Sequence, residues 1–128
     1  MNIFKKLFIK ETDTQDTTTS LLCNEYSFYD VFLRDLLQAK EEVIIESPYI
    51  TIKRLKIFVQ TFEKLIDRNI KVYILTRDPS EHDMEMAMQA EAGIQYCEEI
   101  GIQVLLIKGG HHRKLAMIDR TILWEVLR

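Results

Sequence analysis

The chain has 128 residues, 47% of them hydrophobic and 29% charged, which predicts one folded domain with a single core. Its formal net charge of −3 excludes a protein that binds nucleic acid through a general positive charge, but it leaves room for a local basic site. No run approaches the roughly 18 apolar residues that a membrane span needs, and the first ten residues do not resemble a signal peptide. We therefore expect a cytoplasmic protein without a transmembrane segment.

The N-terminal part divides into two stretches. Residues 1–10 alternate lysines with apolar residues and could form an amphipathic helix or an edge strand, packed against the domain or serving as an arm for a membrane surface or partner. Residues 11–20 carry no apolar side chain and are typical of a linker. We expect an N-terminal segment and polar linker over residues 1–20, followed by one α/β domain over residues 21–128.

The domain alternates helical and strand patterns. The helical spacings predict helices over 27–40, 51–69 and 82–100, and β-branched apolar runs predict strands over 42–47, 71–76 and 103–107. Such alternation predicts a mainly parallel sheet with helices on both faces. The two cysteines, Cys23 and Cys97, have no metal-ligand spacing and are expected to be buried free thiols.

Most of the recognisable chemistry lies near the C-terminus, after the pair Gly109-Gly110. Here His112 and Lys114 are two residues apart, so on a strand they would share one face, and Arg113 would point to the other. The apolar run 115–118 continues this strand, residues 119–121 predict a turn, and 122–124 predict the returning strand of a β-hairpin. Asp119 then stands at the far end of the first strand.

This segment, His-x-Lys followed by four residues and Asp119, resembles the signature of the phospholipase D superfamily. The preceding elements are similar to one half of that fold, and the predicted hairpin carries the motif. The resemblance implies a phosphodiesterase that uses neither metal nor cofactor. His112 would be the nucleophile, Lys114 would neutralise the phosphoryl oxygens, and Asp119 would orient a basic neighbour or pin the hairpin.

The mechanism needs a second histidine, because one imidazole cannot attack phosphorus and also protonate the departing oxygen on the opposite side. In the superfamily a second motif supplies it. This chain has one copy, so the resemblance implies a homodimer. Family members usually continue into a strand with a small Gly-Ser pair and an Asn, whereas here Trp124-Glu125 is followed by three residues. The domain is therefore expected to be incomplete at its C-terminus, or a degenerate member.

Ligands of such sheets gather at the carboxyl ends of the strands, so we expect Ser47, Gly110 and Arg113 to bind substrate. Nucleic acid is preferred to phospholipid as the substrate because the motif segment is basic and no lipid-sized pocket is indicated. One alternative is a catalytically inactive or truncated module that binds nucleic acid or a protein partner. Another is an unrelated α/β regulatory domain, in which His112 and Lys114 would face different sides of the sheet.

Overall fold

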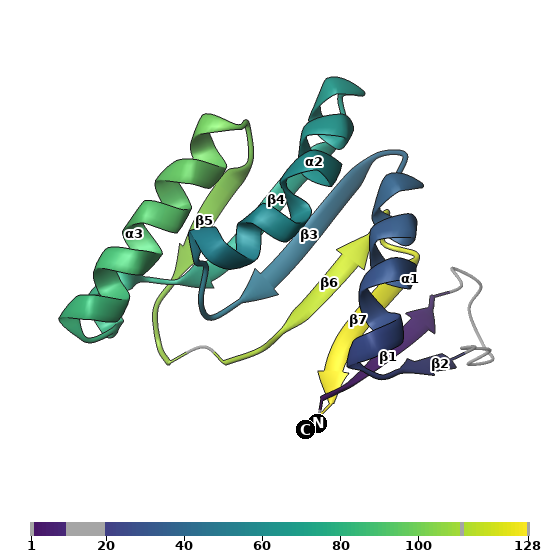
Figure 1. Ribbon diagram of the computed structural model, residues 1–128, viewed down its shortest axis with the longest axis horizontal. Helices are drawn as coiled ribbons and strands as arrows, with labels where there is room; N and C mark the ends of the chain where they lie inside the picture. The colour runs from purple at the N-terminus through teal and green to yellow at the C-terminus, as the bar shows by residue number, and fades with distance from the viewer. Residues whose placement is uncertain (1, 10–19, 111, 128) are drawn as a thin grey trace.

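The computed structural model describes residues 2–9, 20–110 and 112–127. In chain order its elements are β1 (Ile3–Phe8), β2 (Ser20–Cys23), α1 (Glu25–Leu37), β3 (Glu42–Ser47), α2 (Ile52–Asp67), β4 (Lys71–Arg77), the short 3₁₀ helix η1 (Pro79–Glu81), α3 (Met84–Glu99), β5 (Gln103–Ile107), β6 (Leu115–Ile118) and β7 (Ile122–Leu127). The strands of the described residues form one sheet in the order β2-β1-β7-β6-β3-β4-β5 (Figure 1).

The sheet has a parallel and an antiparallel part. The strands β3, β4 and β5 pair in parallel, as the βαβ alternation predicts. The hairpin β6–β7 joins the other side of β3 with antiparallel pairing, and β1 and β2 extend the sheet in the same antiparallel manner. The predicted α/β class and the terminal hairpin are thus confirmed, with parallel pairing confined to β3, β4 and β5.

The helices cover one face of the sheet, whereas the sequence predicted helices on both faces. The chain steps from β3 to β4 to β5 in a single direction, so the right-handed crossovers through α2 and α3 place both helices on the same side. Helix α1 contacts α2 on that side, and Figure 1 shows the three helices in front of the strands. Because the described chain never reverses its direction across the parallel strands, no crossover in it covers the opposite face. On that face Leu105 is 53% exposed.

All three α-helices begin at one edge of the sheet. Asn24 caps α1, with its Oδ1 accepting hydrogen bonds from the backbone N–H groups of Tyr26 (2.9 Å) and Ser27 (3.0 Å), so this helix begins before the predicted Ser27. Thr51 caps α2 and Asp83 caps α3. This edge, where β3 and β4 end and where β6 and the three helices begin, is called the motif edge below and lies at the bottom of Figure 1.

Buried polar contacts connect β1 and β7 to α1. The ammonium of Lys6 lies 2.7 Å from Oδ2 of Asp35 in α1, and the indole N–H of Trp124 in β7 donates to the same oxygen at 2.9 Å. Phe28 and Phe32 of α1 pack edge-on against Trp124. The segment Ile3–Phe8 therefore belongs to the sheet, although the sequence placed residues 1–20 before the domain. Residues 11–19 of the predicted linker lie outside the described residues, and its last residue, Ser20, begins β2.

Two further expectations concern the whole chain. Cys23 and Cys97 are both buried free thiols, as predicted. Among the described residues, no helix has the length and apolar character that crossing a membrane requires.

Candidate active site

The first part of the motif lies at the motif edge, just ahead of β6. The strand begins at Leu115, so His112, Arg113 and Lys114 precede it instead of forming its first residues. Leu115 pairs with Glu46 at the end of β3 and with Glu125 near the end of β7, which places the motif between these two strand ends. His112 and Arg113 are exposed and Lys114 is half-buried. His111 lies outside the described residues.

His112 and Lys114 face a common space. Both line an open groove of about 390 Å³, together with Arg113 and the end of β7. A second cavity, of about 300 Å³, runs between α1, α2 and the sheet and also includes Lys114 in its wall. Lys114 thus lies where the two spaces meet. Arg113, which was expected to point to the other face, borders the same groove, so the shared face of His112 and Lys114 stays a prediction.

Ser47 and Arg54 line the second cavity together with Lys114. The Ser47 hydroxyl donates a hydrogen bond to the Tyr49 carbonyl at 2.9 Å, which leaves its oxygen lone pairs as acceptors. Arg54 was not predicted from the sequence. It stands in the first turn of α2, three residues after the Thr51 cap, and that position after a strand end was the signal for it. Ser47 and the cation Arg54 therefore share this cavity with Lys114, and the role of Ser47 in binding substrate stays a prediction.

Gly110 lies next to the motif, but its N–H group is already used. It donates to Oε1 of Glu81 at 3.2 Å, and the N–H of Gly109 donates to Oε2 of Glu81 at 2.7 Å. The expected role of Gly110, offering its backbone to a phosphate, therefore competes with this contact. The N–H of Gly109, the side chain of Arg77 and the N–H of Gly110 all donate to the Glu81 carboxylate and hold its pKa below the ordinary value. The sequence analysis did not single out Glu81.

Asp119 is separated from His112 and Lys114 by the whole length of β6. Its carboxylate accepts hydrogen bonds from the backbone N–H groups of Lys40 (2.8 Å), Glu41 (2.8 Å) and Glu42 (3.0 Å). These contacts fasten the β6–β7 turn to the connection between α1 and β3. The catalytic assignment of Asp119 is therefore corrected to its other predicted role, pinning the hairpin.

The electrostatics of Asp119 agree with that role. Partial burial raises its pKa, but the three N–H donors outweigh burial, and the pKa lies below the ordinary value. The Nε of the neighbouring Arg120 lies 3.0 Å from Oε2 of Glu42 at this same far end. Arg120 therefore does not belong to the positive charge at the motif edge.

The described residues hold no group of three or more His, Cys, Asp or Glu side chains placed to bind a metal ion. The cations at the motif edge are side chains: Lys114 and Arg54 at the second cavity and Arg113 at the groove. Carboxylates line the same spaces: Glu25, Glu46 and Glu125 lie at the second cavity, and Glu125 lies at the groove.

Comparison with known families agrees with this geometry. The sequence profile of the family described as "Cardiolipin synthase, PLD-like domain" matches residues 32–125, which is more than half of the chain and includes the motif. The chain belongs to the phospholipase D-like family. Members of this superfamily are generally enzymes that process phosphodiesters. No curated protein matches the sequence.

Two solved structures are similar to this phospholipase D-like domain. NucT from Helicobacter pylori is 16% identical, with a TM-score of 0.49 over 76% of this chain and 75% of its own. The phosphatidylserine synthase of Haemophilus influenzae Rd KW20 is 17% identical, with a TM-score of 0.57 over 75% of this chain. The match covers 30% of the synthase chain. At this level of identity, the second likeness shows the fold alone.

Proposed function

We propose that this phospholipase D-like domain is a metal-independent phosphodiesterase that works through a phosphohistidine intermediate. The observation that carries the proposal is that His112 and Lys114 line one groove at the motif edge. A neutral imidazole is a competent nucleophile near pH 7, and a fixed cation beside it favours the phosphoryl group as negative charge shifts during displacement.

The reaction has two displacements. In the first, a ring nitrogen of His112 attacks phosphorus and forms a P–N bond, the P–O bond to the leaving group breaks, and the leaving oxygen takes a proton from a second histidine. In the second, that histidine removes a proton from water, the water oxygen attacks phosphorus, and the P–N bond breaks. Lys114 supplies the positive charge beside the phosphoryl oxygens in both steps.

The second histidine comes from another copy of the chain in this proposal. His112 is exposed in an open groove, so a twofold-related copy facing this groove would bring a second His112 to the same phosphate and would also exclude water. One imidazole is then neutral and the other protonated. The pH dependence of turnover is expected to be bell-shaped and to belong to the pair.

Nucleic acid is the proposed substrate. The exposed Arg113 lies in the groove beside His112, and Lys108, whose side chain is 77% exposed, precedes the glycine pair. Exposed cations on both sides of the nucleophile suit a polyanion that continues past the bond being cut. Phosphates on either side of the scissile one would contact these two side chains.

The proposal is tested with labelled single-stranded and duplex oligonucleotides in excess EDTA. The purified wild-type chain is expected to cleave, and His112→Ala is expected to lose turnover and keep most of its binding. Arg113→Ala is the matched control from the same groove, for which weaker binding and retained turnover are expected. Failure of the well-folded wild-type chain to cleave any of these oligonucleotides would refute the nuclease assignment.

Mixing wild-type and His112→Ala chains tests the dimer separately. If one site needs both histidines, an equal mixture at exchange equilibrium retains about one quarter of the wild-type turnover, because only one dimer in about four has two wild-type chains. Independent chains would retain about one half. The second value, or a monomeric mass in active solutions, would exclude the shared site.

A second candidate function is a non-catalytic module that binds nucleic acid. The exposed Arg113 and Lys108 favour it, because such side chains bind phosphates whether or not a bond is cut. In that case His112→Ala weakens association modestly, and the wild-type chain binds the oligonucleotides without cutting them.

A further inference from the structure

The two loops at the end of the parallel strands form a clamp. One joins β4 to α3 and contains Asp78 and Glu81, and the other leaves β5 toward the motif and contains Gly109 and Gly110. They are neighbours because β4 and β5 pair in parallel and end together at the motif edge (Figure 1). The backbone N–H of Asp78 donates to the carbonyl of Ile107 at 3.0 Å, which extends the pairing of the strands into the loops.

Glu81 closes this clamp with both of its carboxylate oxygens. Oε2 accepts from the N–H of Gly109 at 2.7 Å, and Oε1 accepts from the N–H of Gly110 at 3.2 Å. The guanidinium of Arg77 donates to Oε1 at 3.0 Å and holds the carboxylate from the opposite side. Charge-assisted hydrogen bonds of this kind are stronger than neutral ones. The acid therefore links the end of β4 to the two residues that lead into the motif.

The glycine pair has little else to hold its shape. Gly109 (φ +107°) and Gly110 (φ +71°) both adopt the left-handed conformation, and a Cβ built at either position would meet no atom within 4 Å. A turn of two glycines without packing has high conformational freedom when it is not tethered. The hydrogen bonds to Glu81 are thus the contacts that select one conformation of this turn.

We propose that Glu81 is a positioning residue of the candidate active site, which sets the place of His112 by holding the Gly109–Gly110 turn. Gly110 is two residues before His112, so the tether lies within about 7 Å of chain from the nucleophile. Displacement at phosphorus requires the nucleophile in line with the leaving oxygen, and a shift of about 1 Å can lower the rate about 100-fold. The role assigned to Glu81 rests on the proposed function of His112.

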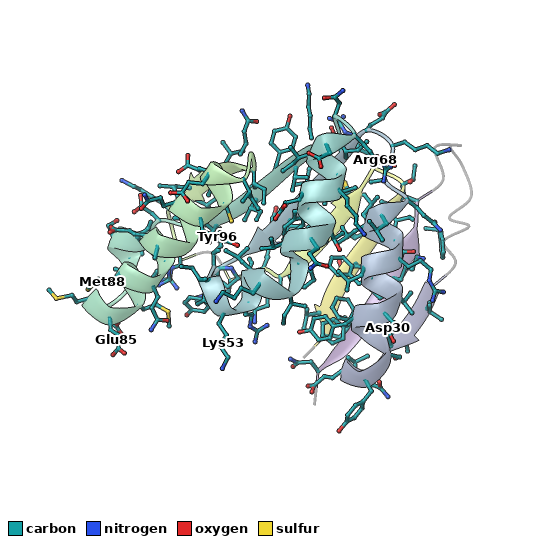
Figure 2. All side chains as sticks on the ribbon, turned by 45° about the horizontal axis from the view of Figure 1, so that its top comes forward. Asp30, Lys53, Arg68, Glu85, Met88 and Tyr96 are labelled. Atoms are coloured by element: carbon teal, nitrogen blue, oxygen red, sulfur yellow. The ribbon has the colours of Figure 1, made fainter. Side chains whose placement is uncertain are left out.

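The test uses Glu81→Gln and Glu81→Ala with Glu85→Gln as the matched control. An amide side chain has one acceptor oxygen, so Gln cannot accept from both glycine N–H groups in the manner of a carboxylate. Glu85 is an exposed acid in the first turn of α3 that points away from the domain (Figure 2), so its substitution removes the same charge nearby. All three variants are compared at temperatures where unfolding is absent.

The first readout is kinetic. Both Glu81 variants are expected to lower kcat about 10- to 100-fold with KM within about threefold of wild type, because the tether orients the nucleophile and does not bind substrate. Glu85→Gln is expected to match wild type. Unchanged kcat in Glu81→Ala would overturn the proposal, as would a purely KM effect.

The second readout does not need turnover. Amide hydrogen exchange at Gly109 and Gly110 is expected to rise at least about tenfold in both Glu81 variants, and the ring signals of His112 in NMR spectra are expected to shift. If the wild-type chain proves inactive, the proposed function fails, but hydrogen exchange at the glycines and the His112 signals still test whether Glu81 holds the turn. Exchange and His112 signals identical to those of wild type would refute the role of Glu81 in either case.

Discussion

Replacement of Asp119 tests whether the third motif residue supports the fold or the chemistry. Its carboxylate accepts three backbone hydrogen bonds that connect the β6–β7 turn to the start of β3. Two of the donors, Lys40 and Glu41, are exposed, and water can replace Asp119 there, whereas the N–H of Glu42 is partly buried. With about 0.5 kcal/mol for each exposed bond and about 1–2 kcal/mol for the partly buried one, Asp119→Ala is expected to destabilise the domain by about 2–3 kcal/mol.

Asp119→Asn separates the charge from the shape. Asn retains one acceptor oxygen and tolerates the left-handed backbone of this position (φ 51°), so we expect a loss of only about 1–2 kcal/mol. Because the folded pKa of Asp119 lies below its unfolded value, the difference between wild type and Asn is complete above about pH 4 and disappears as the pH falls through the folded pKa.

Urea unfolding at several pH values measures these differences, and thermal unfolding is expected to show a lower Tm by about 10 °C for Asp119→Ala. Activity per folded molecule is expected to persist in both variants, because β6 separates this carboxylate from the groove. Loss of activity in Asp119→Asn at a temperature and pH where it is fully folded would refute the reasoning. So would an unchanged unfolding midpoint in Asp119→Ala.

Three further changes have definite expected outcomes. Gly93→Ala is expected to destabilise the domain by about 1–3 kcal/mol in urea unfolding, although alanine has the better helix propensity. The reason is that the Cβ of alanine would lie 2.7 Å from the carbonyl oxygen of Ile50. A stabilised variant would contradict this packing. Asp35→Ala leaves the ammonium of Lys6 buried without its counter-charge and is expected to lower the free energy of unfolding by about 3–5 kcal/mol. A loss below about 1 kcal/mol would show that the Lys6–Asp35 pair is solvated. Burial raises the pKa of the Cys97 thiol to about 12. Alkylation of Cys97 by iodoacetamide at pH 8 is therefore expected only after denaturation. Rapid labelling of Cys97 in the native chain would contradict the burial of this thiol.

Local sequence patterns were sufficient for most of the helices and strands. The predicted strands 42–47 and 103–107 agree with β3 and β5, and the predicted helices 51–69 and 82–100 contain α2 and α3. These elements carry strong periodicity or β-branched runs, which depend on neighbours in the chain alone. Short segments were harder to predict, and β2 has only four residues. The pattern of residues 1–10 suited either a helix or a strand, and the contact of Lys6 with Asp35 in a distant helix is not visible in that pattern.

The candidate site also divides into residues that local sequence indicated and residues whose contacts depend on distant segments. His112 and Lys114 were singled out because their spacing resembles the family motif, and both residues border one groove in the structure. Asp119 was misassigned because spacing does not show which partners a carboxylate meets, and those partners come from residues about 80 positions earlier. Glu81 was missed since its contacts to Gly109 and Gly110 exist only when β4 and β5 pair.

The sequence by itself determined the α/β class and the order of the main elements, because both follow from short-range periodicity. Only the tertiary structure decided that the helices share one face, that β1 belongs to the sheet, and that the carboxylates of Asp119 and Glu81 accept hydrogen bonds from backbone N–H groups. The physical reason is that burial and hydrogen-bond partners depend on which distant segments become neighbours, and the linear pattern of residues does not contain that information directly.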